Sequence, residues 1–407
     1  MMLWLLLSFI SSGAGRAQSV MAATVRERAP RYFAAKPGAL AKAKARLAAG
    51  DQELGHALTN LLAEAEMAKQ ETPPSVTHKA KLPPSGDRHD YMSRAPYYWP
   101  DPAKENGLPY VRHDGKVNPE SRDERANDSP RIKLMAGAVE TLALAYYFTG
   151  NEAYAAQAAK FARTWFLDPA TRMNPNFKFA QAVPGQNDGR GSGIIEARAI
   201  AEAADALGLL AHSKSWPAAD QRSLAAWLGT FLDWLLTSKT GRDEQAAKNN
   251  HGTLFDGQTA RLALCLGRTD LARQILEEAK AHRIAPQIEP DGRQPLELAR
   301  TASFGYSRLN LEGLCELATL GEHAGVDLWY FTTPDGRGIR RALEFMLPYL
   351  DRPAKPWPFP QIKPSHPSDF LGILRAAALA YDAPEFARLV GKYPDAPQGR
   401  FQLLFAK

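Results

Sequence analysis

The stretch IKLMAGAVETLALAYYFTGNEAYAAQAAKFARTWF, residues Ile132 to Phe166, contains two helical patterns separated by Gly150-Asn151. In both halves apolar residues recur three and four positions apart, which is the spacing of a helix with a buried face. Glycine often ends a helix and asparagine often caps the next, so this dipeptide predicts a tight turn. We therefore expect antiparallel neighbouring helices over 132–149 and 152–166.

The same pattern continues along most of the chain. It predicts helices over 37–49, 52–69, 193–211, 217–237, 253–266, 270–282, 307–324, 338–350, 368–381 and 384–392. Runs of β-branched residues with a period of two are nearly absent. Successive helix pairs can bury their apolar faces in a toroid or in a solenoid, and the chain shows no repeat of fixed period. These observations favour an all-α (α/α) toroid, and no linker divides it, so we expect one domain over 26–407.

Residues 71–130 break the helical pattern, because prolines recur throughout this segment. It is rich in aromatic and charged residues, and a long irregular segment of that kind is usually a functional loop. Tyr97, Tyr98 and Trp99 stand in it and are suited to stacking on sugar rings. Packing under the loop is the alternative role for each of them.

The N-terminus has the pattern of an export signal. Leu3 to Ile10 is nearly all apolar, and small residues at positions 15 and 17 permit cleavage after Ala17. No apolar stretch approaches the roughly twenty residues that span a bilayer. We expect residues 1–25 to lie outside the fold, and a protein that is periplasmic or secreted without membrane insertion.

Charge and cysteine content narrow the classes of partner. The net charge of +6 and the pI near 9.1 favour an acidic partner, although they also serve solubility. Basic residues are scattered and no nucleic-acid motif appears, so an acidic polysaccharide is preferred over nucleic acid. Cys265 and Cys315 lie in apolar helical stretches, as buried thiols do. No histidine or cysteine spacing suggests a metal, and we expect no cofactor and a monomer.

Two short motifs contain polar and aromatic residues of the types that act in catalysis. The first, KNNHGT at 248–253, places Asn249, Asn250 and His251 ahead of a predicted helix. Asparagine and threonine suit helix N-caps, so a plain cap is the alternative explanation. The second, ELARTASFGY at 297–306, carries Arg300 and Tyr306. Contact between these two requires a local turn at Gly305; an ion pair of Arg300 with Glu297 and a core tyrosine is the alternative.

Together the motifs supply amide donors, an imidazole, a guanidinium and a phenol. This set suits the removal of a proton from the carbon beside a carboxylate that the protein holds. Two other classes remain open. A glycoside hydrolase would use two carboxylates, for which Asp188 and Glu196 are conceivable. A non-catalytic polysaccharide-binding protein would keep the aromatic residues without these motifs.

The chain resembles the alginate-lyase superfamily of uronate polysaccharide lyases. The resemblance rests on Asn249-Asn250-His251, on the Arg300 to Tyr306 spacing, and on the segments GDRHDYMS (86–93), APYYWPDP (95–102) and QAVPGQNDGRG (181–191). It implies an incomplete (α/α) toroid. In alginate lyases with the Asn-Asn-His-Ser-Tyr-Trp form, aromatic residues follow the histidine. Here Gly252-Thr253-Leu254 stands instead, which suggests a separate branch.

The resemblance also implies metal-independent β-elimination on a β-1,4-linked uronan, mannuronate-rich alginate or glucuronan. Asn250, His251 and Arg300 would neutralise the substrate carboxylate. Tyr306 would take H5 if positive surroundings lower its pKa, and would return a proton to the leaving O4. His251 is the competing base. The expected substrate-binding residues are, besides the aromatic loop, His89, Gln181, Asn187, Arg190, Asn249, Lys363 and His366.

Overall fold

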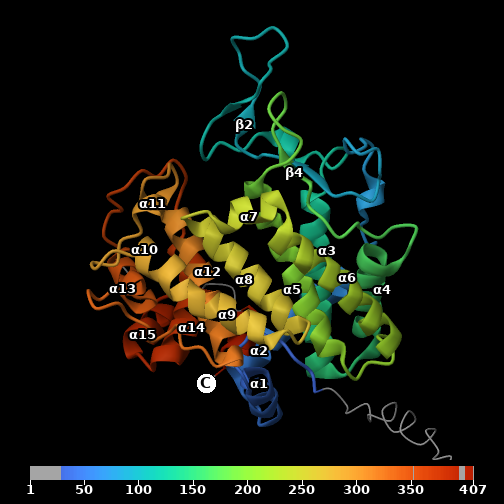
Figure 1. Ribbon diagram of the computed structural model, residues 1–407. Coiled ribbons are helices and arrows are strands. Elements are labelled where there is room, and N and C mark those ends of the chain that lie inside the picture. The colour runs from blue at the N-terminus through green and yellow to red at the C-terminus, as the bar shows by residue number, and fades with distance from the viewer. Residues whose placement is uncertain (1–28, 352, 394–398, 407) are drawn as a thin grey trace, which may run out of the picture.

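A computed structural model describes residues 29–351, 353–393 and 399–406, and its helices form a ring (Figure 1). The export signal predicted within residues 1–25 lies outside the described residues. The buried apolar side chains form one continuous cluster that extends from Tyr32 to Ala406. No helix among the described residues is long and apolar enough to cross a membrane.

The inside of the ring is a series of helices, each of which packs on the next. In chain order they are α3 (Ser129–Thr149), α5 (Arg198–Leu207), α8 (Asn250–Cys265), α12 (Ser303–Ala324) and α14 (Leu371–Tyr381). The gap between α14 and α3 is bridged by α16 (Phe401–Leu404) and α2 (Gln52–Gln70). The predicted all-α fold, an incomplete (α/α) toroid, is confirmed.

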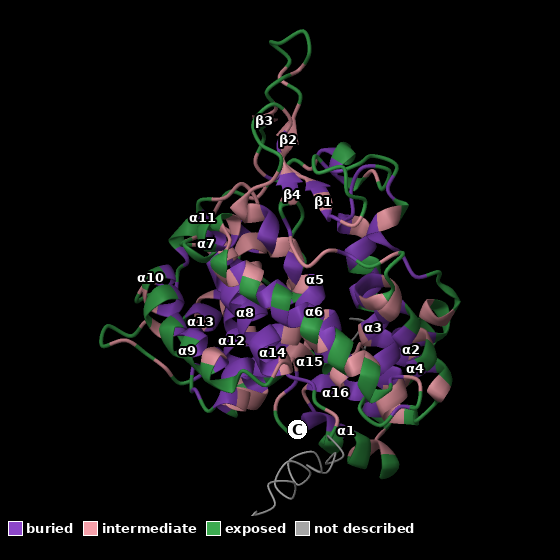
Figure 2. Cartoon of the chain, turned by 45° about the vertical axis from the view of Figure 1, so that its right-hand side comes forward, coloured by how far each residue is buried: buried purple, intermediate pink, exposed green. Residues whose placement is uncertain are grey.

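A second helix follows each inner helix in the chain, and these second helices form an outer layer (Figure 2). These outer helices are α4 (Glu152–Ala162), α6 (Ala218–Thr237), α9 (Thr269–Ala279), α13 (Ile339–Leu350) and α15 (Pro384–Gly391). Burial separates the two layers. Nearly every residue of α8 is buried, whereas α9 buries only one face, with apolar residues three and four positions apart.

The remaining helices are short or lie at the ends of the ring. They are α1 (Ala39–Ala48), α7 (Lys239–Gln245), α10 (Ala285–Gln287) and α11 (Pro295–Leu298). Short stretches of 3₁₀-helix occur at Val76–His78, Pro119–Arg122, Gly191–Ala197, Gly208–Leu210 and Pro367–Phe370. Turns of π-helix end α4 at Arg163–Leu167 and α9 at Lys280–Ile284.

The turn that was predicted between residues 149 and 152 is confirmed. Gly150 ends α3 with φ of 71°, a conformation that costs glycine little. The Asn151 side chain then caps α4 by accepting a hydrogen bond from the Ala153 amide.

The single helix predicted over 193–211 is wrong. The segment divides into 3₁₀ turns at 191–197 and 208–210 on either side of α5. At the first of these the backbone lies against the short strand β4 (Phe179–Ala182), and a Cβ on Gly193 would come within 2.4 Å of the Ala180 carbonyl oxygen. Apolar periodicity does not report such a close backbone contact, so the prediction extended the helix through it.

Short strands and long loops cover one end of the ring (Figure 1). Strand β1 (Met92–Arg94) pairs in parallel with β4 (Phe179–Ala182). Strands β2 (Tyr98–Trp99) and β3 (Val111–Arg112) pair antiparallel, with Tyr98 opposite Arg112, and their loop projects away from the ring. This is the irregular aromatic segment that the prolines predicted. We call this end of the molecule the loop face.

The cysteines are free thiols. Cys315 is buried, as predicted, whereas Cys265 is only half-buried.

Candidate active site

The first motif begins α8 directly under the loop face. The helix starts at Asn250, earlier than the predicted 253, and Asn249 caps it by accepting from the His251 amide at 3.3 Å. Asn249 therefore acts as the helix cap that the sequence allowed as the alternative. Asn250 and His251 occupy the first turn, where their side chains have fixed directions.

Arg283 holds the corner between α7 and α8 in place. Its guanidinium donates to the Gln245 and Ala247 carbonyl oxygens at 2.7 and 2.9 Å and forms an ion pair with Asp256. Gly252 lies against this corner, because a Cβ there would come within 2.2 Å of the Ala247 oxygen and 2.5 Å of Arg283. The glycine at this position is thus a packing requirement of this chain.

Asn250 is buried and bound to Glu297. Its backbone amide and its side-chain Nδ2 each donate to one carboxylate oxygen of Glu297 at 2.7 Å. Burial raises the pKa of Glu297, and the hydrogen bonds from Asn250 and the charges of Arg300 and His251 oppose that rise. The Asn250 Oδ1 is buried and has no hydrogen-bond partner among the described residues.

His251 is held by Glu244 of α7. Its Nδ1 lies 2.6 Å from Glu244 Oε1, and the Glu244 side chain is only 2% exposed. When Nδ1 carries the proton that binds the carboxylate, Nε2 keeps its lone pair. The imidazole side chain is 22% exposed, so a substrate can reach it.

Arg300 is bound to Asp114 rather than to Glu297. Its Nη2 and Nε donate to the two oxygens of Asp114 at 2.7 and 3.2 Å. Burial alone would raise the pKa of Asp114, but hydrogen bonds from Arg300 and Thr301 outweigh it and hold the pKa well below its usual range. The pair joins the loop that follows β3 to the segment before α12.

Arg300 and Tyr306 are in contact, and the inference that contact requires a local turn at Gly305 is wrong. The helix α12 begins at Ser303, so Gly305 is helical and Arg300 precedes the first turn. The Arg300 guanidinium carbon lies 3.6 Å from the centre of the Tyr306 ring, within cation–π distance.

The expectation that positive surroundings lower the pKa of Tyr306 is wrong for the free protein. Burial and the hydrogen bond to the Tyr97 hydroxyl, at 2.9 Å, raise this pKa well above its usual value, and the charge of Arg300 only partly offsets them. The Tyr306 phenol is therefore protonated at neutral pH. In this state the phenol can donate a proton but cannot act as a base.

A second group of predicted residues lies beside this one. Arg190 donates to the Gln181 side-chain oxygen at 2.8 Å and to the Tyr98 hydroxyl at 3.3 Å. Gly191 packs on α7, where a Cβ would meet the Glu244 amide at 3.2 Å. Burial lowers the pKa of Arg190, and the charge of Glu244 opposes this. The Tyr98, Gln181 and Arg190 network thus adjoins the His251 and Glu244 pair.

Other predicted residues have contacts outside these groups. His89 Nδ1 bonds to the Arg172 carbonyl oxygen at 2.6 Å, and the Trp99 indole donates to the Lys116 carbonyl oxygen. Asn187 is exposed, and its side chain accepts from the Val183 amide. Lys363 and His366 are exposed and follow a segment in which Ile362 bonds to the Thr301 carbonyl oxygen.

The carboxylates Asp114, Glu244 and Glu297 were not among the predicted residues. Asp114 is 186 positions from Arg300, so no local pattern joins them. Glu244 stands seven residues before His251, and that proximity was an available signal. Glu297 was considered, but as a partner of Arg300 rather than of Asn250.

The carboxylates named for a hydrolase do not form a matched pair. Glu196 accepts hydrogen bonds from the Tyr91 and Ser93 hydroxyls at 2.8 and 2.6 Å, and Asp188 is exposed. Within the described ranges no group of three His, Cys, Asp or Glu residues could hold a metal ion.

Comparisons with known proteins show which family the chain and its fold belong to. A family model described as alginate lyase matches residues 75–357. The crystal structure of an alginate lyase from Bacteroides ovatus is 38% identical, with a TM-score of 0.87, over 92% of this chain and 99% of that chain.

More distant structures share the fold. Alginate lyase A1-III from a Sphingomonas species is 20% identical, with a TM-score of 0.52, over 85% of this chain and 94% of that chain. A variant of that lyase complexed with a tetrasaccharide is 19% identical, with a TM-score of 0.60, over 94% and 98% of the two chains. No curated protein matches the chain significantly. From the match over most of its length, the chain belongs to the alginate lyase family of polysaccharide lyases.

Proposed function

We propose that the protein cleaves a β-1,4-linked uronan by β-elimination and leaves 4,5-unsaturated uronate ends. The observation that carries the proposal is that His251, Arg300 and Tyr306 lie close together, each held by its own partner. Arg300 contacts the Tyr306 ring, and the charges of Arg300 and His251 both act on Glu297. An imidazole with a free nitrogen, a guanidinium and a protonated phenol are the groups that this reaction requires.

The reaction starts at a weakly acidic C–H bond. H5 of a uronate lies beside the carboxylate, and its removal places negative charge on the carboxylate oxygens. Donors aimed at those oxygens stabilise the charge as it develops. Arg300 supplies such donors through Nη1, which is not used in its bonds to Asp114. Asn250 supplies the second proton of its amide.

We assign the two proton transfers to different residues. His251 Nε2 removes H5, because Glu244 occupies Nδ1 and leaves the Nε2 lone pair available. The electron pair of the C5–H bond forms the C4–C5 double bond as the C4–O4 bond breaks. The Tyr306 phenol gives its proton to the leaving O4, as its raised pKa favours. Proton exchange with solvent then removes the proton from His251 and returns one to Tyr306.

Mannuronate-rich alginate and glucuronan are the proposed substrates. Both carry one carboxylate per sugar and suit the positive charge of the chain. Since residues 1–25 have the pattern of an export signal, we place the activity in the periplasm or outside the cell.

A panel of purified uronans tests the function. The protein is incubated with polymannuronate, polyguluronate, glucuronan and a neutral β-1,4-glucan, and unsaturated product is followed by its near-ultraviolet absorbance. Absorbance should rise with polymannuronate or glucuronan and stay flat with the neutral glucan. New reducing ends without absorbance would indicate a hydrolase. No product from any of the uronans would contradict the proposal.

A further inference from the structure

Next to the candidate active site, the ring contains a pocket of about 290 Å³. Its charged lining consists of Arg94, Arg122, Lys133, Arg198, Glu196 and Glu202. Gln181 and Pro96 also line it. Gln181 belongs to the Arg190 network, and Pro96 directly precedes Tyr97, so the pocket shares a wall with the candidate active site. We call it the basic pocket.

The cations of the basic pocket are only partly neutralised. Arg94 forms an ion pair with Glu120, and Arg198 lies 3.7 Å from both Glu202 and Glu316. Arg122 and Lys133, by contrast, are exposed and form no ion pair or hydrogen bond with other described residues. Two cations therefore remain available to an anion from outside.

The two carboxylates in the same pocket already have partners of their own. Glu202 lies 3.7 Å from Arg198, and the charge of Lys133 acts on Glu196 without a direct ion pair. Glu196 also accepts hydrogen bonds from Tyr91 and Ser93. In addition Ser129, the first residue of the long helix α3, lines the pocket, and the N-terminus of that helix contributes partial positive charge.

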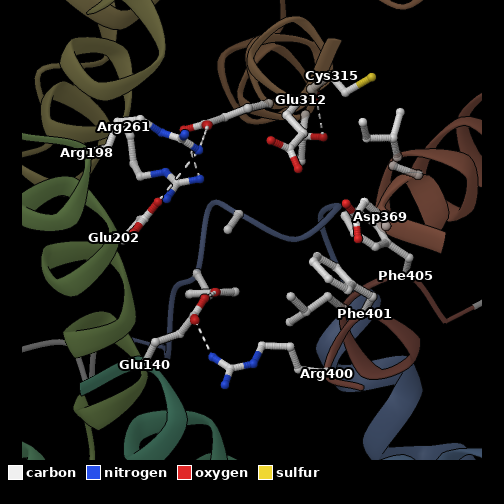
Figure 3. A pocket seen from close by; sticks show the side chains of 18 residues that line it. Glu140, Arg198, Glu202, Arg261, Glu312, Cys315, Asp369, Arg400, Phe401 and Phe405 are labelled. Carbon is white, nitrogen blue, oxygen red and sulfur yellow. Dashed lines mark hydrogen bonds and ion pairs between the residues drawn. The ribbon is translucent and has the colours of Figure 1, made fainter. Parts of the chain in front are cut away.

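Farther into the ring the charge changes sign. A cavity of about 320 Å³ adjoins the basic pocket, and Arg198 and Glu202 line both (Figure 3). Its other charged residues are Glu140, Glu312, Glu316, Asp369, Arg261 and Arg400, so carboxylates outnumber guanidiniums. Arg261 and Arg400 are already paired with Glu316 and Glu140. An anion is thus favoured in the basic pocket and disfavoured beyond it.

We propose that the basic pocket binds the carboxylate of a second uronate unit on the same polysaccharide chain, through Arg122 and Lys133. The inference rests on the proposed function, since it takes the polysaccharide to be a uronan. Every unit of such a chain carries a carboxylate, and the shared wall at Gln181 lets one chain reach both sites. The acidic cavity stops the chain from entering farther along the ring.

The test compares an Arg122→Gln/Lys133→Gln protein with a matched control, Arg222→Gln/Lys42→Gln. The control residues are exposed on α6 and α1, outside the lining of the basic pocket. Both pairs of changes are made in the wild-type chain and in a Tyr306→Phe chain. Calorimetry on the Tyr306→Phe proteins measures the binding of saturated hexamers of mannuronate and of glucuronate, and the other proteins are assayed on the polymers.

Binding of the preferred hexamer should weaken at least about fivefold in the pocket variant and not in the control, the scale of two exposed ion pairs. KM for the polymer should rise by a similar factor, while kcat stays within about twofold. Equal binding by pocket variant and control, or no binding of either hexamer by the Tyr306→Phe protein, would overturn the proposal. If the wild-type protein cleaves no uronan, the proposed function fails, yet the calorimetry still reports on the pocket separately.

Discussion

A neutral imidazole donates through one ring nitrogen and accepts through the other, so its partner decides which nitrogen can act as a base. In this protein the partner of His251 is Glu244, whose side chain is almost fully buried and 2.6 Å from Nδ1. Glu244 touches no substrate in the proposed mechanism. It is a positioning residue that fixes the orientation and tautomer of His251.

Glu244→Gln tests this role. The amide keeps the shape of the side chain but removes the charge that stabilises the imidazolium formed during proton removal. We expect kcat to fall at least about tenfold, with KM little changed. Asp243→Asn is the control, because Asp243 is the exposed neighbour of Glu244 and forms an ion pair with Lys239. Equal turnover by the two variants would show that His251 needs no partner.

The phenol of Tyr306 gives a second prediction at this scale. Tyr306→Phe keeps the ring but removes the proton donor, so turnover should fall at least about a hundredfold, with circular dichroism unchanged. Tyr330→Phe, on the exposed far side, is the control. Since burial raises the pKa of Tyr306, wild-type activity should not decline on the alkaline side until above about pH 10. Near-normal turnover in Tyr306→Phe would show that the phenol does not donate the proton to the leaving oxygen.

The sequence singled out the residues to which we assign the reaction more readily than the partners that hold them. Asn250, His251, Arg300 and Tyr306 stand out because their residue types suit chemistry and interrupt apolar helices. The sequence does not distinguish a carboxylate partner in this way, since Asp and Glu are common on the surfaces of helices. The direction of the Tyr306 pKa shift was also missed, because burial and the Tyr97 hydroxyl outweigh the charge of Arg300.

At the scale of elements, the Arg300 and Asp114 pair fastens the loop after β3 to the segment that enters α12. Thr301 adds to the same contact, since its amide and hydroxyl both donate to Asp114. A Cβ on Gly115 would meet the Thr301 hydroxyl at 2.6 Å, so the two segments touch closely. The loop face is therefore held by charge as well as by packing.

Asp114→Asn should lower the melting temperature at pH 7, and the loss should depend on pH. The pKa of Asp114 is lower in the folded chain than in the unfolded chain. Its stabilisation is then complete above the unfolded value near 4 and is lost as the pH falls toward the folded value. The difference between wild type and variant should narrow below about pH 4. A difference that stays constant, or that also appears in the exposed control Asp188→Asn, would contradict the assignment.

Helices were predictable where apolar spacing alone determined them, as in the pair around Gly150-Asn151. The errors fall at the ends of helices and where the backbone of one element touches another. Gly193 allows a 3₁₀ turn to lie on β4, and α8 and α12 begin earlier than predicted because Asn249 caps the one and the chain before Ser303 turns into the other. The contact of Gly193 with β4 joins separate segments of the chain, whereas the cap of α8 is local and the sequence had offered it as the alternative role of Asn249.

On the scale of the whole molecule, the ring brings α8, the segment before α12 and the aromatic loop to one end. Positive charge at that end comes from side chains: Arg300 and Arg190 at the reaction groups, and Arg122 and Lys133 in the basic pocket. A uronate carboxylate can be neutralised there without a cation from solution.

Activity should therefore survive chelation. The protein is dialysed against EDTA, its metal content is measured, and unsaturated product from the preferred uronan is followed with and without added calcium. We expect initial rates equal within about twofold in all conditions, since the donors that stabilise the developing charge are a guanidinium and an amide. The control is a calcium-dependent uronan lyase assayed in the same buffers, which must lose its activity. Loss of activity in EDTA that calcium restores would mean that a metal ion, and not Arg300 with Asn250, neutralises the substrate carboxylate.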